Sequence, residues 1–345
     1  MEKALIAMSG GVDSSVAAYL MQCRGYECAG ATMQLWENTP TEDAQKVAKQ
    51  LGMDFFIFDY TSDFSREVVD KFIGCYEAGG TPNPCVDCNR CLKFGALLDK
   101  ALSLGYDKIA TGHYATIQKD PTTGRFLLFR AEDGNKDQTY FLASLTQQQL
   151  AHIEFPLGGL NKETVRKIAE EQGFLNANKR DSQDICFIPD GDYLSFMKKY
   201  TGKEYPAGDY LDLSGKVVGK HSGAVGYTIG QRKGLGLAMG EPVYVCAKDM
   251  ERNTVTVGSN DDLFHTTLRA NNWNFIPFSA LTEPIRVTAK IRYRHIEQPA
   301  TVYPEEKGFA RVVFDTPQRA ITTGQAVVLY DGNLVVGGGT ITEVL

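Results

Sequence analysis

The first 115 residues alternate between two kinds of apolar segment. Short apolar runs predict strands, and apolar residues spaced three or four apart predict helices. The expected strands are residues 3–8, 54–60 and 108–115, and the expected helices are residues 16–21, 41–51 and 94–104. Such alternation indicates a parallel sheet covered by helices on both faces, with ligands bound at the carboxyl ends of its strands.

The pattern changes near residue 200, where glycine turns and short alternating strands replace the helices. From Leu268 onward almost every segment predicts a strand, and the segment at residues 285–293 is apolar at every second position. Such strands typically close into a small β-barrel. We therefore expect an α/β protein of three parts: a Rossmann-like parallel-sheet domain at residues 1–200, a small central β-rich domain at residues 201–266, and a C-terminal β-barrel at residues 267–345.

The composition fits this architecture and restricts the kinds of partner that the protein can bind. The chain has 345 residues, of which 43% are hydrophobic and 23% charged, enough to bury a sizeable core. Its net charge of −6 is not that of a globally basic nucleic-acid binder, so RNA contact requires local basic patches. The apolar run at residues 4–8 is too short for a signal peptide, and no apolar stretch reaches the length of a membrane span. We expect a cytoplasmic protein without a membrane partner, whose eight cysteines serve as reactive thiols, metal ligands or core residues.

The segment SGGVDSS at residues 9–15 joins the first expected strand to the first expected helix. A helix N-terminus in this position offers free backbone N–H groups and a positive dipole to an anion such as phosphate. The glycines permit close approach, the serines add hydroxyl donors, and Asp13 is a candidate ligand for Mg²⁺ on a polyphosphate. The lysine of a Walker loop is missing. Its absence favours a loop that holds leaving pyrophosphate during adenylation over one that transfers the outer phosphate.

Cysteines gather in two segments. Cys85, Cys88 and Cys91 lie in the proline-containing stretch TPNPCVDCNRC, which we expect to be irregular, and Cys186 lies in a second loop. Thiolates are strong nucleophiles that form disulfides and persulfides, and cations such as Lys93 raise this reactivity. The CxxCxxC spacing with a distant fourth cysteine is also that of bacterial iron–sulfur sites, whereas zinc lacks a complete local ligand set. Sulfur transfer by thiols and an iron–sulfur cluster therefore both remain open.

Six stretches, taken together, resemble the tRNA-uridine 2-sulfurtransferase family. They are SGGVDSS, TPNPCVDCNRCLKFG, ATGHYA, KDQTYFL, SQDICFIP and GYTIGQRKGLGL, and they occur in the family's order across nearly the whole chain. SGGVDSS alone resembles the pyrophosphate loop of the N-type ATP pyrophosphatases. The family resemblance implies an N-terminal ATP pyrophosphatase domain, a small central domain and a C-terminal barrel that contacts tRNA.

The resemblance also implies a reaction. The C2 oxygen of the wobble uridine attacks ATP, pyrophosphate leaves, a cysteine persulfide delivers sulfur to the activated carbon, and AMP departs. The implied cofactors are ATP and Mg²⁺, with an iron–sulfur cluster on Cys85, Cys88 and Cys186 as the alternative sulfur carrier. The implied partners are a tRNA with a wobble uridine and an upstream sulfur donor protein.

Residue roles follow from the resemblance by position. Cys88 corresponds to the nucleophile and Cys186 to the persulfide carrier. Cys85 stands where many members carry an aspartate thought to be the general base, so that role is vacant or passes to Asp87. The implied nucleotide contacts are Ala7, Met8, Ser9, Gly10, Gly11, Val12, Asp13, Ser14, Ser15, Met33 and Gly112. The implied contacts with tRNA or its target base are Asn83, Pro84, Cys85, His113, Lys136, Asp137, Gln138, Arg292, Tyr293 and Gln325.

Strand periodicity gives an independent argument for RNA. Arg286, Lys290, Arg292 and Arg294 alternate with apolar residues, so we expect them to share one face of a strand. Such a basic row can follow phosphates, although a solvated outer face is the alternative interpretation.

Two other functions compete with tRNA thiolation. A ligase that adenylates a small metabolite would share the glycine loop but would not need the barrel or the paired cysteines. An RNA-binding module that carries an iron–sulfur cluster would not need the glycine loop.

Overall fold

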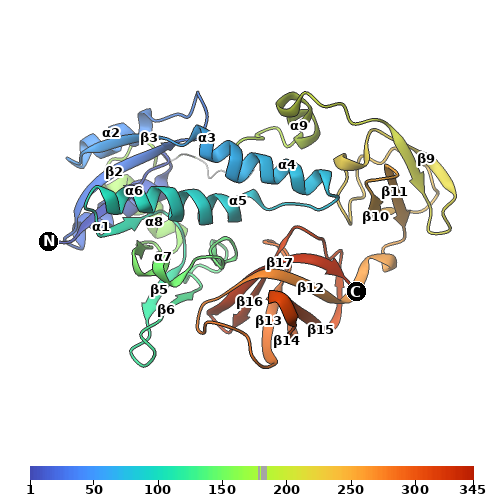
Figure 1. Cartoon of the computed structure of the whole chain (residues 1–345). Helices are drawn as coiled ribbons and strands as arrows, with labels where there is room; N and C mark the ends of the chain where they lie inside the picture. Colours follow the sequence, from blue (N-terminus) through green and yellow to red (C-terminus); the bar gives the residue numbers. More distant parts are fainter. Residues whose placement is uncertain (178, 180–184) are drawn as a thin grey trace.

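The computed structural model describes residues 1–177, 179 and 185–345 (Figure 1). Its N-terminal part contains a parallel sheet of five strands in the order β3-β2-β1-β4-β7. These strands are β1 (Lys3–Ala7), β2 (Glu27–Gln34), β3 (Phe55–Asp59), β4 (Lys108–Ala110) and β7 (Ile153–Glu154). The order reverses between β1 and β4, and in open parallel sheets ligands bind at the carboxyl ends of the strands at such a reversal.

Helices cover both faces of this sheet, as expected. Ala4 and Ile6 belong to a core that also contains residues of α1 (Val12–Cys23), α2 (Glu42–Gln50) and α8 (Lys162–Glu171). Leu5 belongs to the opposite core, with residues of α6 (Leu97–Ser103) and α7 (Gln147–Ala151). Successive strand residues point to opposite faces, so one apolar strand supplies both cores.

Short elements connect these layers. They are α3 (Thr61–Phe64), η1 (Ser65–Val69), α4 (Asp70–Glu77), α5 (Pro84–Asp87), η2 (Cys88–Ala96), β5 (Thr116–Lys119), β6 (Phe126–Phe129), η3 (Thr139–Phe141) and α9 (Tyr193–Thr201). In the ranges that the structure describes, no helix is long and apolar enough to cross a membrane.

The cysteine segment is helical, which corrects the expectation of an irregular stretch. α5 begins at Pro84, and η2 and α6 continue the same helix to Ser103 (Figure 1). Pro84 is buried at the first helical position, where no N–H is needed and its fixed φ suits the helix. The proline that predicted a loop therefore begins a helix. The middle of this helix, η2, is π-helical, a rare conformation that is frequent at functional sites.

Two β-structures follow α9. The central sheet has the order β10-β11-β8-β9, and six antiparallel strands close into a barrel because β12 pairs with both β15 and β17. The central elements are β8 (Gly208–Leu211), β9 (Val217–His221), η4 (Ala224–Gly226), β10 (Tyr244–Asp249), β11 (Thr254–Gly258) and η5 (Asp261–Leu263). The barrel elements are β12 (Phe264–Phe275), β13 (Ile285–Lys290), β14 (Gln298–Pro304), η6 (Glu306–Gly308), β15 (Ala310–Arg319), β16 (Ala326–Asp331) and β17 (Leu334–Val344). The expected fold class is confirmed.

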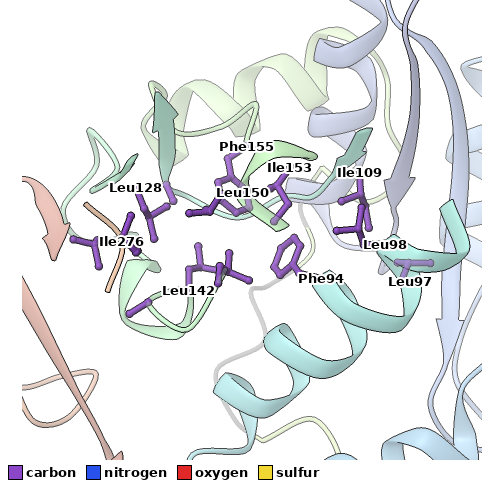
Figure 2. Close-up of a cluster of buried hydrophobic side chains, with 14 of the residues drawn as sticks. Phe94, Leu97, Leu98, Ile109, Leu128, Leu142, Leu150, Ile153, Phe155 and Ile276 are labelled. Carbon is purple, nitrogen blue, oxygen red and sulfur yellow. The ribbon is translucent and has the colours of Figure 1, made fainter. Parts of the chain in front are cut away.

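One hydrophobic core joins the N-terminal part to the barrel (Figure 2). Phe94 and Leu97, from the helix that carries the cysteines, are fully buried in the same cluster as Leu142 and the barrel residue Ile276. Val328, Tyr330 and Val335 of the barrel belong to it as well. The cysteine-bearing helix therefore packs into a cluster that the sheet and the barrel share.

Candidate active site

The glycine loop turns sharply between β1 and α1. Gly10 has a φ of +73°, a left-handed conformation that favours glycine, and Gly11 directly precedes the first turn of α1. The buried hydroxyls of Ser14 and Ser15 both donate to the Gly11 carbonyl, at 3.0 and 3.1 Å. These two serines stabilise the loop from within, whereas Ser9 is exposed. An anion at this loop would depend mainly on backbone N–H groups.

The other residues expected around a nucleotide surround this loop. Ala7 ends β1, Met8 is buried beside it, and Met33 lies near the end of β2. A Cβ at Gly112 would lie 2.7 Å from both the Asp13 carbonyl carbon and the Ser14 nitrogen. Because no side chain fits there, a glycine is required for the end of β4 to approach the loop.

The Asp13 carboxylate is engaged by protein groups. Lys162 Nζ donates to Oδ1 at 2.7 Å and to Oδ2 at 2.8 Å, and the Tyr114 hydroxyl donates to Oδ1 at 2.7 Å. Lys162 is the first residue of α8, and its side chain is only 12% exposed. A magnesium ligand must turn its oxygens toward the ion. This arrangement therefore does not fit Asp13 as the expected Mg²⁺ ligand.

His113 packs behind the loop as a buried residue. Its Nδ1 lies 2.7 Å from Thr111 Oγ1, and its ring contacts those of Phe94 and Phe155. Burial holds the pKa of His113 well below its ordinary value, and Lys93 lowers it further. The imidazole is therefore neutral at physiological pH.

The thiols of the two cysteine segments come together. Cys88 packs against the same hydrophobic cluster as Ile185 and Phe187, the two neighbours of Cys186. The charges of Cys186 and Cys85 both raise the pKa of Cys88, so the three thiols are close enough to interact. Cys88 is half-buried, whereas Cys85 and Cys186 are exposed. The structure thus brings the two implied sulfur carriers into the same region of the protein.

Burial and one lysine set the protonation of these thiols. Burial raises the pKa of Cys88 to about 12. Although Cys85 and Cys186 are partly open to solvent, desolvation by the surrounding protein raises the pKa of their thiols as well. The ammonium group of Lys93 opposes this and lowers the pKa of all three thiols. Lys93 also lowers the pKa of His113, so its charge acts on both the thiols and this imidazole.

The thiols do not form a metal site. Across the residues that the structure describes, which include all eight cysteines, no group of three His, Cys, Asp or Glu side chains is arranged to hold a metal ion. Cys85, Cys88 and Cys186 as they lie therefore do not fit the ligand set of an iron–sulfur cluster.

Asp87 lies on the same helix among different neighbours. Burial raises the pKa of its carboxyl, Arg90 and Lys71 lower it, and Glu67 raises it. A raised pKa suits a carboxylate that must accept a proton near neutral pH. The Arg90 guanidinium lies 3.5 Å from Asp87 Oδ1.

The barrel holds the loop that leads into the cysteine-bearing helix. Gln325 Nε2 donates to the carbonyls of Thr81 and Pro82, at 2.9 and 3.0 Å. Asn83, next in the chain, is the residue before the first turn of α5. The amide group of Gln325 that was expected to contact tRNA therefore has an intramolecular role.

The KDQTYFL segment is partly internal. Asp137 is buried, where Oδ2 accepts from the Thr139 hydroxyl at 2.7 Å and Oδ1 from the Ala131 N–H at 3.2 Å. Gln138 and Tyr114 are joined by two hydrogen bonds of 3.0 Å, one from each backbone N–H. Lys136 is half-buried. Asp137 thus shapes the turn rather than facing solvent.

The expected row of basic residues on one strand is wrong beyond Lys290. β13 ends there, and Arg292 and Arg294 follow in a bent segment, where alternation in the sequence no longer fixes a common face. Arg286 and Lys290 do share the strand. Arg286 Nη1 and Nη2 donate to the two carboxylate oxygens of Asp315, at 2.7 and 2.8 Å, so this arginine is already paired.

Arg292 and Tyr293 pack against the body of the protein. Arg292 Nη2 donates to the Ala320 carbonyl at 2.5 Å and to Thr322 Oγ1 at 2.6 Å. The ring centroids of Tyr293 and Phe141 lie 4.4 Å apart. Arg292 therefore joins elements of the protein and is not a freely projecting cation.

Sequence reasoning missed three residues that support the glycine loop. Lys162 binds Asp13, Asn176 Nδ2 donates to the Gly10 carbonyl at 3.1 Å, and Lys179 pairs with Asp43 at 3.0 Å beside the same carbonyl. One signal for Lys162 was available. Lys162 is the first residue of a helix, where the helix dipole disfavours a cation. A lysine at such a position is therefore expected to bind an acidic group elsewhere in the protein.

Comparisons with known proteins match the whole chain. Models of a tRNA methyl transferase HUP domain, a tRNA methyl transferase PRC-barrel domain and an aminomethyltransferase beta-barrel domain match residues 2–190, 194–259 and 265–341. The tRNA-specific 2-thiouridylases MnmA of Moorella thermoacetica and Acetivibrio thermocellus are 50% and 48% identical to this chain, each over 99% of both proteins. The tRNA-specific 2-thiouridylase MnmA of Clostridioides difficile is 46% identical over 100% of this chain and 99% of its own.

Proposed function

This chain belongs to the tRNA-specific 2-thiouridylase family and is a tRNA sulfurtransferase, and we propose that it thiolates C2 of the wobble uridine through a cysteine persulfide. The observation that carries the proposal is the convergence of Cys88 and the segment around Cys186 on one hydrophobic cluster. We also propose that the chain divides into a catalytic domain at 1–200, a central domain at 201–266 and a tRNA-contacting barrel at 267–345.

The first step is adenylation. The C2 oxygen of uridine attacks the α-phosphorus of ATP, the bond to the bridging oxygen breaks, and pyrophosphate leaves. The backbone N–H groups at the start of α1 face the departing anion, with Gly10, Gly11 and Gly112 permitting close approach. Activation as the adenylate converts a poor leaving oxygen into AMP, which makes attack by sulfur feasible.

The second step moves sulfur. A sulfur donor protein first leaves a persulfide on Cys186, which is exposed and so accessible to that donor. The terminal sulfur of the persulfide attacks C2, and AMP leaves with the original oxygen. Cys88 then attacks the Sγ of Cys186, so that the sulfur on C2 departs as the thiocarbonyl and a Cys88–Cys186 disulfide forms. A cellular thiol reduces this disulfide before the next cycle.

The remaining roles follow the geometry. Asp87, whose pKa is raised by burial, is our candidate for the general base. Asn83 and Cys85 lie at the start of the helix that carries Cys88, so they are candidates for contact with the target base. We infer that Gln325, Arg292 and Asp137 act by shaping this region rather than by holding RNA with their bonded groups.

The test is the dependence of ATP cleavage on RNA. With purified protein, AMP and pyrophosphate should form only with a tRNA that carries an unmodified wobble uridine, and 2-thiouridine should appear when a persulfide donor is added. Cys88→Ser and Cys186→Ser should each abolish 2-thiouridine, whereas Cys91→Ser should retain it. Equal ATP cleavage without RNA would favour a small-molecule ligase. Thiolation that requires iron in anaerobically purified protein would favour a cluster as the sulfur carrier.

A further inference from the structure

We propose that Gln149 is a positioning residue for sulfur transfer, because it holds the π-helical turn that sets the direction of Cys88. The inference rests on the proposed function and concerns its last step, the attack of Cys88 on the Sγ of Cys186. Gln149 belongs to α7 and lies outside the six stretches that carried the family resemblance.

The helix that carries Cys88 is wider than an α-helix in its middle part, η2. The Leu97 N–H donates to the Leu92 carbonyl, five residues earlier, whereas an α-helix bonds four residues earlier. One such turn therefore contains an additional residue. Each residue turns an α-helix by about 100° and advances it by about 1.5 Å. Conversion of the widened turn to an α-helix would rotate one end of the helix against the other by that amount.

The end of the helix after the widened turn is held in the core. Phe94 and Leu97 are fully buried in the cluster that the barrel shares (Figure 2). Rotation of this end would remove both side chains from the core, so a change of register would turn the part that carries Cys88. Its neighbour Asn89 is 3% exposed and donates from Nδ2 to the Phe141 carbonyl at 3.3 Å, a contact that belongs to the present register.

The side chain of Gln149 bonds to the carbonyls of the widened turn. Its Nε2 donates to the Arg90 carbonyl at 3.1 Å and to the Phe94 carbonyl at 2.7 Å. A side chain that enters the backbone ladder in this way changes the local course of a helix. Its Oε1 accepts from the Thr146 N–H at 2.9 Å, within the capping box of α7. The next residue, Leu150, is buried in one cluster with Phe94, which keeps α7 beside the helix (Figure 2).

Gly95 suits the same turn from within the helix. A Cβ at this position would lie 3.0 Å from the Arg90 carbonyl oxygen, the atom to which Gln149 donates. Glycine leaves room for this carbonyl and, unlike alanine, does not favour the α-helix. Two residues on different elements therefore stabilise one widened turn.

The position of Cys88 matters for only one of the chemical steps. Adenylation and the attack of the persulfide on C2 do not use Cys88, whereas release of the product requires its sulfur to reach the Sγ of Cys186 in line. A misplaced Cys88 should therefore stall the protein after AMP has left, with Cys186 joined to C2 of the uridine through a disulfide. An added thiol can attack the same Sγ and release the 2-thiouridine.

The test is a single turnover of the full-length protein. Protein loaded with persulfide on Cys186 is mixed with ATP and unmodified tRNA without reductant, and AMP and protein-free thiolated tRNA are measured over time. Gln149→Glu removes both N–H donors and keeps the oxygen that accepts from Thr146. We expect this variant to release thiolated tRNA about 10- to 100-fold more slowly than wild type, with AMP formed at the wild-type rate. Dithiothreitol added after the turnover should release the trapped tRNA.

Gln147→Glu makes the same chemical change on the same helix and is the matched control. Gln147 Nε2 donates to the carbonyls of Phe126 and Ile276, at 2.8 and 3.1 Å, which belong to β6 and the barrel. Its Oε1 accepts from the Phe126 N–H at 2.8 Å. We expect a lower melting temperature in this variant, with AMP formation and tRNA release both at wild-type rates.

Gly95→Ala tests the widened turn without a change in α7. It should delay release of thiolated tRNA and leave AMP formation unchanged, as Gln149→Glu does. It also provides the test if Gln149→Glu does not fold, which its melting curve establishes.

The remaining outcomes separate this inference from the proposed function. Release at the wild-type rate in folded Gln149→Glu or in Gly95→Ala would overturn the role of the turn, as would equal slowing in Gln147→Glu. Slowing of AMP formation in step with release would also overturn it. Release at the wild-type rate from Cys88→Ser would instead overturn the proposed function, because Cys88 would then take no part in sulfur transfer.

Discussion

Single residues set the protonation of the thiols at this site. Burial makes the thiols weak acids, and Lys93 is the cation that favours the thiolate of Cys85, Cys88 and Cys186 together. Because the thiolate is the nucleophile, the charge at position 93 should control the rate at which these sulfurs react. Lys93 thereby links the chemistry of two segments that are distant in sequence.

Removal of this charge should slow alkylation of the thiols. In Lys93→Met the pKa of each thiol rises, so the thiolate fraction at pH 8 falls and iodoacetamide should react roughly 3- to 10-fold more slowly with Cys88 and Cys186. Mass spectrometry of the two peptides gives the rates. Lys100→Met, an exposed position farther along the same helix, is the matched control, and an equal slowing there would contradict the account.

The pH profile of Cys88 should show the same raised pKa. With a pKa of about 12, the thiol remains mostly protonated at pH 9, and its alkylation rate should continue to rise through pH 10. An unperturbed thiol, with a pKa of about 8.5, would approach its plateau about one pH unit above that value. A plateau of the Cys88 rate below about pH 10 would contradict the raised pKa.

At the scale of single residues, the sequence predicted which residues form the loop better than it predicted the partners of their side chains. The motif SGGVDSS indicated an anion loop, and the structure gives that loop the expected position between strand and helix. The motif did not indicate that Ser14 and Ser15 donate to the Gly11 carbonyl, or that Lys162 binds the Asp13 carboxylate, because those partners depend on how the chain folds.

Elements position the site through two close approaches, the end of β4 against the glycine loop and the helix from Pro84 to Ser103 against the sheet. Three strands and three helices of the first 115 residues were predictable from periodicity, because each is amphipathic or apolar. β2 and the helical segment from Thr61 to Glu77 were not predicted. Pro84 and the segment after Lys290 were misread for physical reasons. Proline is common both in loops and in the first turn of a helix, so Pro84 alone could not distinguish them. Apolar and basic residues continue to alternate in the sequence after Lys290, although the strand ends there.

Gly112 tests the first of these approaches. A Cβ at this position would overlap the backbone of Asp13 and Ser14, so Gly112→Ala should displace the loop, lower ATP affinity by about tenfold or more and cost about 1–3 kcal/mol of stability. Gly159→Ala is the control, since a Cβ there meets no atom within 4 Å. Nucleotide titration and thermal melting give both quantities, and unchanged ATP affinity in Gly112→Ala would contradict this geometry.

At the scale of the whole molecule, one hydrophobic cluster is shared by the N-terminal sheet and the barrel. The sequence predicted three parts with different patterns of strands and helices, but it gave no sign that Ile276 would be buried in one cluster with Leu142 and Phe94 (Figure 2). Contacts between separate parts leave no periodic signal in the chain. The barrel thereby also fixes the entry to the cysteine-bearing helix, through Gln325.

This shared core should make unfolding cooperative across the parts. Ile276→Ala removes a fully buried side chain and should cost about 2–5 kcal/mol, lowering the melting temperature in one transition reported by probes in both the sheet and the barrel. Ile296→Ala, an isoleucine that is 78% exposed, should change stability by less than about 0.5 kcal/mol. A barrel that melts alone in Ile276→Ala would contradict a common core.

The most direct test of sulfur transfer between Cys88 and Cys186 is the state of these thiols after one turnover. Protein loaded with persulfide is mixed with ATP and tRNA without reductant, and its peptides are mapped by mass spectrometry. The account predicts one Cys88–Cys186 disulfide for each 2-thiouridine formed. Stoichiometric 2-thiouridine with Cys88 still present as a free thiol would contradict it.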